Sequence, residues 1–287
     1  GTGALTSNTT GQSNSAFGWS ALNANTTGFG NSAFGTNALR LNVAGVQNSA
    51  FGLGALGSSN ANSNSAFGYA ALQAAITCCN DAFGAYALVA NTSGGQNQAF
   101  GAQALYKNIS GNSNSAFGFF TLFENTTGSS NVAVGSTSMV ANIDGTKNSA
   151  VGVGALSSNT SGDSNVAIGY QAGSLLTTGD NNIVISNAGV AGESRTIRIG
   201  DANQTATYVA GIANSPSVNG TSVVIDANGR LGVGKISQML RLAALAAPPA
   251  TCSVAEAGSV YFDDDSKELC LCDGTSWSGL KVGGACN

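Results

Sequence analysis

Cysteine is the residue type in this chain whose chemistry is easiest to place. Four of the six cysteines, Cys252, Cys270, Cys272 and Cys286, follow residue 250, and together they could form two disulfides or bind one zinc ion. Zinc sites usually contain Cys-x₂-Cys, whereas one residue separates Cys270 from Cys272, so we favour disulfides. Four cysteines allow three disulfide pairings, but Cys270 and Cys272 share one face of a strand and should not pair with each other. This cysteine usage indicates an oxidising compartment.

The remaining residues do not form a recognisable acid–base catalytic site or metal site. The chain has no histidine, which removes the commonest general base and the Ser-His and Cys-His nucleophile pairs. The run Asp263-Asp264-Asp265 could bind calcium, but its spacing is not that of an EF-hand loop, so an exposed acidic turn is the preferred interpretation. We therefore predict a protein that is not an enzyme, with no cofactor, no metal and no catalytic residue.

Charge and hydropathy restrict the partners further. Charged residues make up 8% of the chain, against about a quarter in ordinary proteins, and the net charge is −4. No basic stripe is present to neutralise phosphates, so we do not expect nucleic acid as a partner. No apolar run approaches the ~20 residues of a membrane span. The start Gly1-Thr2-Gly3, without Met or a signal peptide, suggests a processed or excised chain.

A repeat of 17 residues, shortened to 16 in two places, organises most of the chain. Its consensus is Asn-Ser-Ala-Phe-Gly-x-x-Ala-Leu-x-x-Asn-Thr-Thr-Gly-x-x, in which Asn-Thr-Thr-Gly is typical of a turn. A first apolar lane comprises Phe17, Phe34, Phe51, Phe67, Phe83, Phe100, Phe117, Val134, Val151 and Ile168. A second lane lies five residues later and comprises Leu22, Leu39, Leu56, Leu72, Leu88, Leu105, Leu122, Met139 and Leu156.

Each apolar segment has about four residues, which suits a short strand and is too short for a helix. We therefore predict an all-β fold, a parallel β-solenoid or β-roll of about ten coils, each one repeat long. Strand alternation, with the large residues placed inside, makes both apolar lanes the solenoid core. The residue before each aromatic would then point outward, where it would pack against neighbouring chains or simply occupy a narrow coil: Ala16, Ala33, Ala50, Ala66, Ala82, Ala99, Ala116, Ala133, Ala150 and Ala167.

The sequence does not decide the state of two cysteines in the turns or whether the turn asparagines are glycosylated. Cys78 and Cys79 replace the usual corner residues of one coil. They could form a vicinal disulfide, form an interchain bridge or remain as two free thiols. Asn-x-Ser/Thr sequons also recur at the corners, where a turn is favoured over a glycosylation site. The sequon asparagines are Asn8, Asn25, Asn91, Asn108, Asn125, Asn159, Asn203 and Asn219.

The blocks Asn-Ser-Ala-Phe-Gly and Asn-Val-Ala-Ile-Gly resemble the head repeat of trimeric autotransporter adhesins and related repeats of bacterial and phage fibre proteins. The resemblance covers residues 1–200 and implies a parallel β-roll in which three chains pack side by side. It departs from that family in its longer repeat, where the Asn-Thr-Thr-Gly corner looks like an insertion. The membrane anchor barrel of the family is also absent from the sequence.

The repeat weakens after residue 170, and we predict four regions. Residues 1–186 form the solenoid and 187–234 a β-rich neck with a hairpin turn at 226–229. Residues 235–249 form a short helix ended by Pro248-Pro249, and 250–287 a β-hairpin module with the four late cysteines.

These observations predict a structural fibre subunit, exposed outside the cell on a bacterial surface or belonging to a phage fibre. The partner would be the chain itself, as a homotrimer or as a head-to-tail filament, the latter because Gly1 falls within a coil and leaves it uncapped. The alternative is an adhesin or phage tail-fibre protein whose module 250–287 binds a host glycan or protein receptor. Tyr261 and Trp277 are then the first residues to test, although core packing would also explain them.

Overall fold

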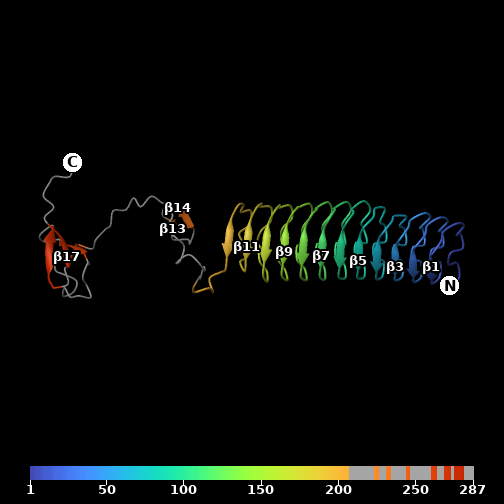
Figure 1. Ribbon diagram of the computed structural model, residues 1–287, viewed down its shortest axis with the longest axis horizontal. Coiled ribbons are helices and arrows are strands. Elements are labelled where there is room, and N and C mark those ends of the chain that lie inside the picture. The colour runs from blue at the N-terminus through green and yellow to red at the C-terminus, as the bar shows by residue number, and fades with distance from the viewer. Residues whose placement is uncertain are drawn as a thin grey trace. The chain divides into compact units, whose positions relative to one another are not determined.

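The computed structural model describes residues 1–206, 223–225, 231–233, 244–245, 260–263, 268–272 and 275–280. The chain divides into two units, Gly1–Thr207 and Tyr208–Asn287, which we describe separately. Unit 1 is a straight rod of stacked coils, with β1 near one end and β11 near the other (Figure 1). The described residues form strands and turns and contain no helix.

One parallel sheet of 12 strands, ordered β1 to β12 as in the sequence, runs the length of unit 1. Each strand pairs in register with its equivalents in the neighbouring coils, as Ala99 does with Ala82 and Ala116. The β-solenoid prediction is confirmed, and the sheet continues to β12, beyond the expected boundary at residue 186. The strands are β1 Ser15–Phe17, β2 Ser32–Phe34, β3 Ser49–Phe51, β4 Ser65–Phe67, β5 Asp81–Phe83, β6 Gln98–Phe100, β7 Ser115–Phe117, β8 Val132–Val134, β9 Ser149–Val151, β10 Val166–Ile168, β11 Ile183–Ile185 and β12 Ile197–Ile199.

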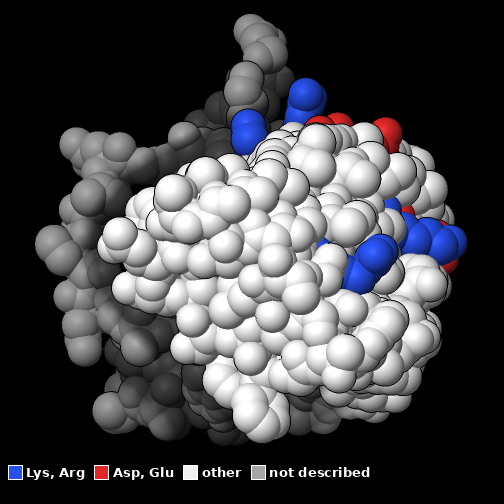
Figure 2. All heavy atoms as spheres, turned by 90° about the vertical axis from the view of Figure 1, so that its right-hand side faces the viewer, with Lys and Arg blue, Asp and Glu red and all other residues white. Residues whose placement is uncertain are grey.

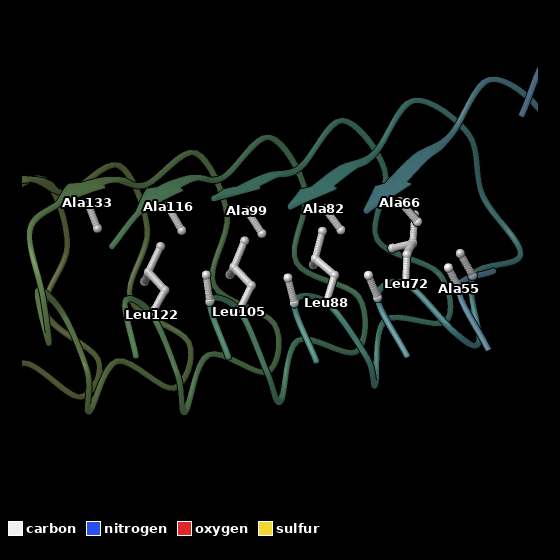
Figure 3. Close-up of a cluster of buried hydrophobic side chains, with 14 of the residues drawn as sticks. Ala55, Ala66, Leu72, Ala82, Leu88, Ala99, Leu105, Ala116, Leu122 and Ala133 are labelled. Carbon is white, nitrogen blue, oxygen red and sulfur yellow. The ribbon is translucent and has the colours of Figure 1, made fainter. Parts of the chain in front are cut away.

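The alanine column faces the inside of the rod, so the predicted orientation of the strands is wrong. Figure 3 shows the strand alanines pointing at the leucines of the opposite wall. Alternation along a three-residue strand then places its first and third side chains on the outer surface. The leucines already fill the interior, which leaves room beneath the strand for a methyl group only. The column is completely buried at Ala33, Ala50, Ala66, Ala82, Ala99, Ala116, Ala133, Ala150 and Ala167, and partly buried at Ala16.

The leucine lane forms the core, as predicted, but on a turn and not on a strand. Leu105, for example, has φ of 53° and lies in a left-handed conformation that residues other than glycine rarely adopt. Its N–H donates to Thr121 O at 3.0 Å, and the same bond recurs from coil to coil. The lane is completely buried at Leu22, Leu39, Leu56, Leu72, Leu88, Leu105, Leu122, Met139 and Leu156.

Two columns of buried asparagines satisfy the backbone at the corners of the coils. In the first column, which we call the Asn108 ladder, each amide bonds a glycine carbonyl of its own corner and, where the preceding coil has an asparagine, the amide of that coil. Asn108 Nδ2 donates to Asn91 Oδ1 at 2.8 Å and to Gly111 O at 3.0 Å. Its rungs are Asn8, Asn25 and Asn42, then Asn91, Asn108, Asn125, Asn142 and Asn159. Ser59 and Ala75 occupy the two missing rungs, in the two coils of 16 residues.

The second column, which we call the Asn114 ladder, precedes the strands and has no missing rung. Asn114 N donates to Asn97 Oδ1 at 3.0 Å, and Asn114 Nδ2 donates to Gly128 O at 2.8 Å. Its members are Asn14, Asn31, Asn48, Asn64, Asn80, Asn97, Asn114, Asn131, Asn148, Asn165 and Asn182.

Unit 2 contains two small sheets among its described residues. β13 (Val223–Ile225) pairs antiparallel with β14 (Leu231–Val233), which confirms the predicted hairpin. β15 (Ala244–Leu245) pairs parallel with β16 (Val260–Asp263), so the prediction of a helix is wrong at these two residues. The remainder of the predicted helix lies outside the described residues. β16, β17 (Glu268–Cys272) and β18 (Trp277–Leu280) continue this sheet in antiparallel order.

Candidate interaction surface

The outer surface of the 12-stranded sheet, which we call the strand face, carries the aromatic lane. The rings from Phe34 to Phe117 stack with centroids 4.6 to 5.0 Å apart and planes within 8° of parallel. Phe17, at one end of the stack, is 73% exposed, and Phe34 and Phe117 are 40% and 38% exposed. These phenylalanines were predicted to lie in the core; they bury much of each other's surface, but on the outside of the rod.

Aliphatic side chains extend the strand face toward β12. Val134, Val151 and Ile168 replace phenylalanine in the lane and are exposed, and branched residues also appear at the first strand position. This first position carries the exposed side chains of Val132, Ile183 and Ile197. Within β1 to β11 the only charged residue is Asp81. In the view along the rod most of the visible surface is uncharged (Figure 2).

A signal for this orientation was present in the repeat. Ten successive strands keep alanine at the middle position, whereas the flanking positions accept Phe, Val and Ile at one and Ser, Asp, Gln and Val at the other. A position that accepts only one small residue lies where space is fixed, and positions that accept different sizes lie where space is free. Weighing variation within the chain above side-chain size would have placed the alanines inside.

The C-terminal end of the solenoid core is covered by an ion pair. Arg198 of β12 pairs with Val184, which itself follows Ala167 in the inward column. The Arg198 guanidinium donates to Glu193 at 2.9 and 3.0 Å, and the two charges are 2.8 Å apart. The hydrogen bond to Glu193 raises the pKa of Arg198, with the neighbouring negative charge acting in the same direction. A charged group therefore stands at the inward position of the last strand, on which the core of any further coil would have to stack.

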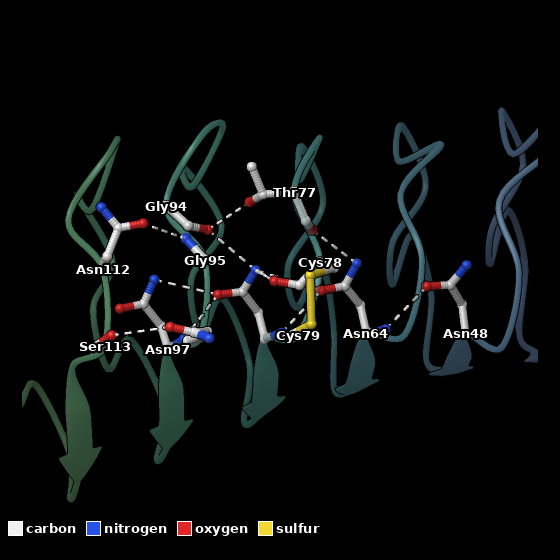
Figure 4. The surroundings of a disulfide bond; sticks show 12 residues. Asn48, Asn64, Thr77, Cys78, Cys79, Gly94, Gly95, Asn97, Asn112 and Ser113 are labelled. Carbon is white, nitrogen blue, oxygen red and sulfur yellow. Dashed lines mark hydrogen bonds between the residues drawn. A yellow bond between two sulfur atoms is a disulfide. The ribbon is translucent and has the colours of Figure 1, made fainter.

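The vicinal cysteines form a disulfide at the corner before β5, and both residues are exposed (Figure 4). The surrounding corner is held by other bonds: Asn80 Nδ2 donates to Cys78 O at 3.1 Å, and Thr77 Oγ1 donates to Gly94 O at 2.6 Å. Of the three states left open by the sequence, the structure therefore has the vicinal disulfide.

Replacing both Cys78 and Cys79 by serine is expected to leave stability nearly unchanged, within about 1 kcal/mol. A disulfide stabilises chiefly by closing a loop in the unfolded chain, and a bond between adjacent residues closes almost none. Thermal unfolding of the two-serine variant, followed by circular dichroism, would measure this. A loss of several kcal/mol would show that the bond holds the coil together.

The corner asparagines of the sequons serve the interior of the rod. Asn25, Asn91, Asn108, Asn125 and Asn159 are completely buried, and the side-chain nitrogen of each donates hydrogen bonds within the corner. A glycan on that nitrogen would replace a donor and require space that the core does not have, so glycosylation is excluded at these five positions in the folded rod.

The remaining sequons differ in their surroundings. Asn8 is half-buried, and Asn203 is exposed and donates to Asp201. Asn219 lies outside the described residues.

The candidate residues of unit 2 lie on the four-stranded sheet. Tyr261 of β16 pairs with Cys270, and Cys272 pairs with Trp277 of β18, so both aromatic residues flank the cysteine-bearing strand β17. Cys252 and Cys286 fall outside the described residues, as does Asp264, while Asp263 ends β16. The predicted disulfides and the two binding candidates therefore remain predictions.

No family model matches the chain, and no curated protein or solved structure is similar enough to count as a match. The resemblance to adhesin head repeats thus rests on the repeat sequence alone. Across the described residues no group of His, Cys, Asp and Glu is arranged to hold a metal ion. The same residues include no helix long and apolar enough to cross a membrane.

Proposed function

We propose that this chain is a subunit of an extracellular structural fibre on a bacterial surface, and that it self-associates side by side through the strand face. The observation that carries the proposal is the exposed lane of stacked phenylalanines, continued by valine and isoleucine. A soluble protein rarely leaves a continuous apolar surface of this length uncovered unless another molecule packs on it. The resemblance to trimeric adhesin heads makes a homotrimer the expected assembly.

The size of the strand face supports this proposal. Twelve strands spaced ~4.8 Å apart make a strip roughly 55 Å long, and three extended residues make it roughly 10 Å wide. The strip covers roughly 500 Å², and its apolar part is about half of that, because the first position is Ser, Asp or Gln in eight of the twelve strands. The distance between neighbouring strands is set by their pairing and is the same along the rod, so copies of the chain can pack in register over its whole length.

The ion pair at the end of the core favours lateral over end-to-end association. A terminal coil can template another chain only if its strand edge and core positions are compatible with one. At β12 the core position is Arg198, bound to Glu193, and inward-pointing charge is one of the devices by which edges avoid pairing. A head-to-tail filament through this end would have to bury that pair.

Replacing Phe67, Phe83 and Phe100 by serine is expected to convert the assembly to monomers while the rod stays folded. The three rings lie outside the buried core, so their loss removes interface area and stacking between neighbouring coils but leaves the leucine and alanine core intact. Analytical ultracentrifugation and native mass measurement of the full chain would report the change. Circular dichroism would check that the coils remain.

A matched control takes three apolar residues from the corners and leaves the strand face intact. Ile76, Ile109 and Ile143 are 67%, 49% and 46% exposed, and their replacement by serine should not change the assembly. A monomeric wild-type chain would contradict the proposal, as would an assembly that survives loss of the three phenylalanines. The alternative of a receptor-binding module at 250–287 remains a prediction.

A further inference from the structure

A second exposed group of aromatic residues lies away from the strand face, on the turns that follow β4 to β7. Its rings form one continuous chain of contacts. Tyr69 meets Tyr86 at 4.9 Å between ring centroids, and Tyr86 meets Tyr106 at 6.3 Å. We call this group the aromatic cluster; it comprises Tyr69, Tyr86, Tyr106, Phe119, Phe120 and Phe123, the last four linked by contacts of 4.2 to 5.0 Å.

The repeat itself shows that the rod does not need aromatic residues at these positions. The position of Phe120 in the repeat is occupied by Thr137 in the next coil and by Gly154 in the coil after that. The position of Phe123 is occupied by Ser157 two coils later. The backbone is the same in each case: Phe120 N donates to Ala102 O at 3.2 Å and Thr137 N donates to Phe119 O at 2.9 Å. Folding therefore leaves these side chains free to vary, and the cluster has another reason to be aromatic.

The cluster is open to solvent and held in place by a rigid support. Tyr69, Tyr86 and Phe119 are 47%, 36% and 53% exposed. Each ring is attached to a coil whose backbone is bonded to the coils on both sides, so a ligand would meet a surface already in its binding shape.

Polar groups border the rings. Lys107 lies 5.5 Å from the centre of the Phe123 ring and pairs with Glu124 at 2.6 Å. Gln103 occupies the same column of the repeat as Tyr86 and Phe120, which places an amide between these two rings. A hydrogen bond with the Tyr69 side chain raises the pKa of the Tyr86 hydroxyl. Together with the tyrosine hydroxyls, the amide of Gln103, the ammonium of Lys107 and the carboxylate of Glu124 flank the apolar surface.

A pyranose ring matches this combination. One side of a sugar ring is a patch of C–H groups that packs on an aromatic face, while its hydroxyls need donors and acceptors at the rim. A second copy of this chain fits less well, because the cluster spans four coils only and an interface between rods would follow the whole length. We propose that the aromatic cluster binds a chain of neutral sugars laid along the rod.

The test measures binding of the full chain to maltohexaose, cellohexaose and chitohexaose by isothermal titration calorimetry. We expect at least one of these probes to bind, and the variant carrying Tyr86→Thr and Phe120→Thr to bind about tenfold more weakly or not at all. Threonine already occupies this column at Thr137, so the variant should fold. Ultracentrifugation of the same variant should show an unchanged assembly.

The matched control is Tyr170→Ser. Tyr170 is 72% exposed and shares a column with Tyr69 and Phe119, but it lies three coils beyond the cluster, and serine occupies that column at Ser136. Binding should be unaffected. The proposal would be overturned if no probe binds, if Tyr170→Ser weakens binding equally, or if Tyr261→Ser with Trp277→Ser abolishes it. A change of assembly in the cluster variant would assign the surface to a second copy instead.

Discussion

Replacing Gly101 by alanine is expected to unfold the middle of the rod. Gly101 has φ of +145°, a conformation that residues with a side chain rarely adopt, and a Cβ there would lie 2.3 Å from Gly118 O and 2.6 Å from its carbonyl carbon. Both obstructing atoms belong to the backbone of the next coil, so no side chain can move aside. We expect a loss of more than about 4 kcal/mol, measured by urea unfolding followed by circular dichroism.

Gly95→Ala is the control for that substitution. Gly95 lies at the corner preceding the same strand, and its added Cβ would make ordinary contacts, the nearest being Cys78 O at 3.5 Å. Its effect should stay within about 1 kcal/mol. If both variants unfolded alike, the close approach of consecutive glycines would not be what sets the coil spacing.

Replacing Asn114 by aspartate is expected to have the second-largest effect. The Asn114 amide is completely buried and donates to Gly128 O at 2.8 Å and to Asn97 Oδ1 at 3.2 Å. A carboxylate would keep the hydrogen bond from Asn131 N, but it would turn these two attractions into repulsions between oxygens and would bury a charge without a counter-ion. The expected loss near neutral pH is about 3 to 5 kcal/mol, read from denaturant unfolding at controlled pH.

The effect of Asn114→Asp should depend on pH with a defined sign. Burial and the facing oxygens disfavour the charged form, so the folded-state pKa of the introduced carboxyl lies above its unfolded value of about 3.9. Stability of the variant relative to wild type is then greatest below pH ~3.9 and falls as pH rises through the folded-state pKa. Below that range the protonated carboxyl can still donate to Gly128 O.

Asn112→Asp is the control, because Asn112 is exposed and accepts a hydrogen bond from Gly95 N at 2.8 Å through its side-chain oxygen. Aspartate already does this at the equivalent position of a later coil, where Asp163 accepts from Thr146 N at 2.5 Å. A pH-independent penalty at Asn114, or an equal penalty at Asn112, would contradict the role of the Asn114 ladder.

The order and register of the coils could be predicted, because a repeated motif every 16 or 17 residues leaves one way to stack, whereas the sheet extends past the predicted boundary at residue 186 to β12. The orientation of each strand could not be obtained from size alone. Alternation allows either Ala99 or Phe100 to face inward, and the choice depends on how much space Leu105 leaves from the opposite wall. That space is a property of the closed coil, and only the unvarying alanine column hints at it.

The left-handed turn at the leucines and the burial of the corner asparagines could not be predicted from the sequence either, for a different physical reason. Leucine is a good residue for regular structure, so nothing in its type predicts the left-handed turn in which Leu88 and Leu105 lie. The corner asparagines were correctly placed in turns, but a turn asparagine is ordinarily solvated. Their burial follows only when identical coils stack and each amide finds the next one.

The missing rungs of the Asn108 ladder bear on the mechanics of the rod. The amide–amide bonds join one coil to the next, so they carry load when the rod is pulled along its length. Ser59 and Ala75 interrupt this line, and the side-chain oxygen Oδ1 of Asn42 faces the gap without a hydrogen-bond partner. Under tension the rod should therefore yield first between Asn42 and Asn91, which leaves two stiff segments joined by the weaker coils.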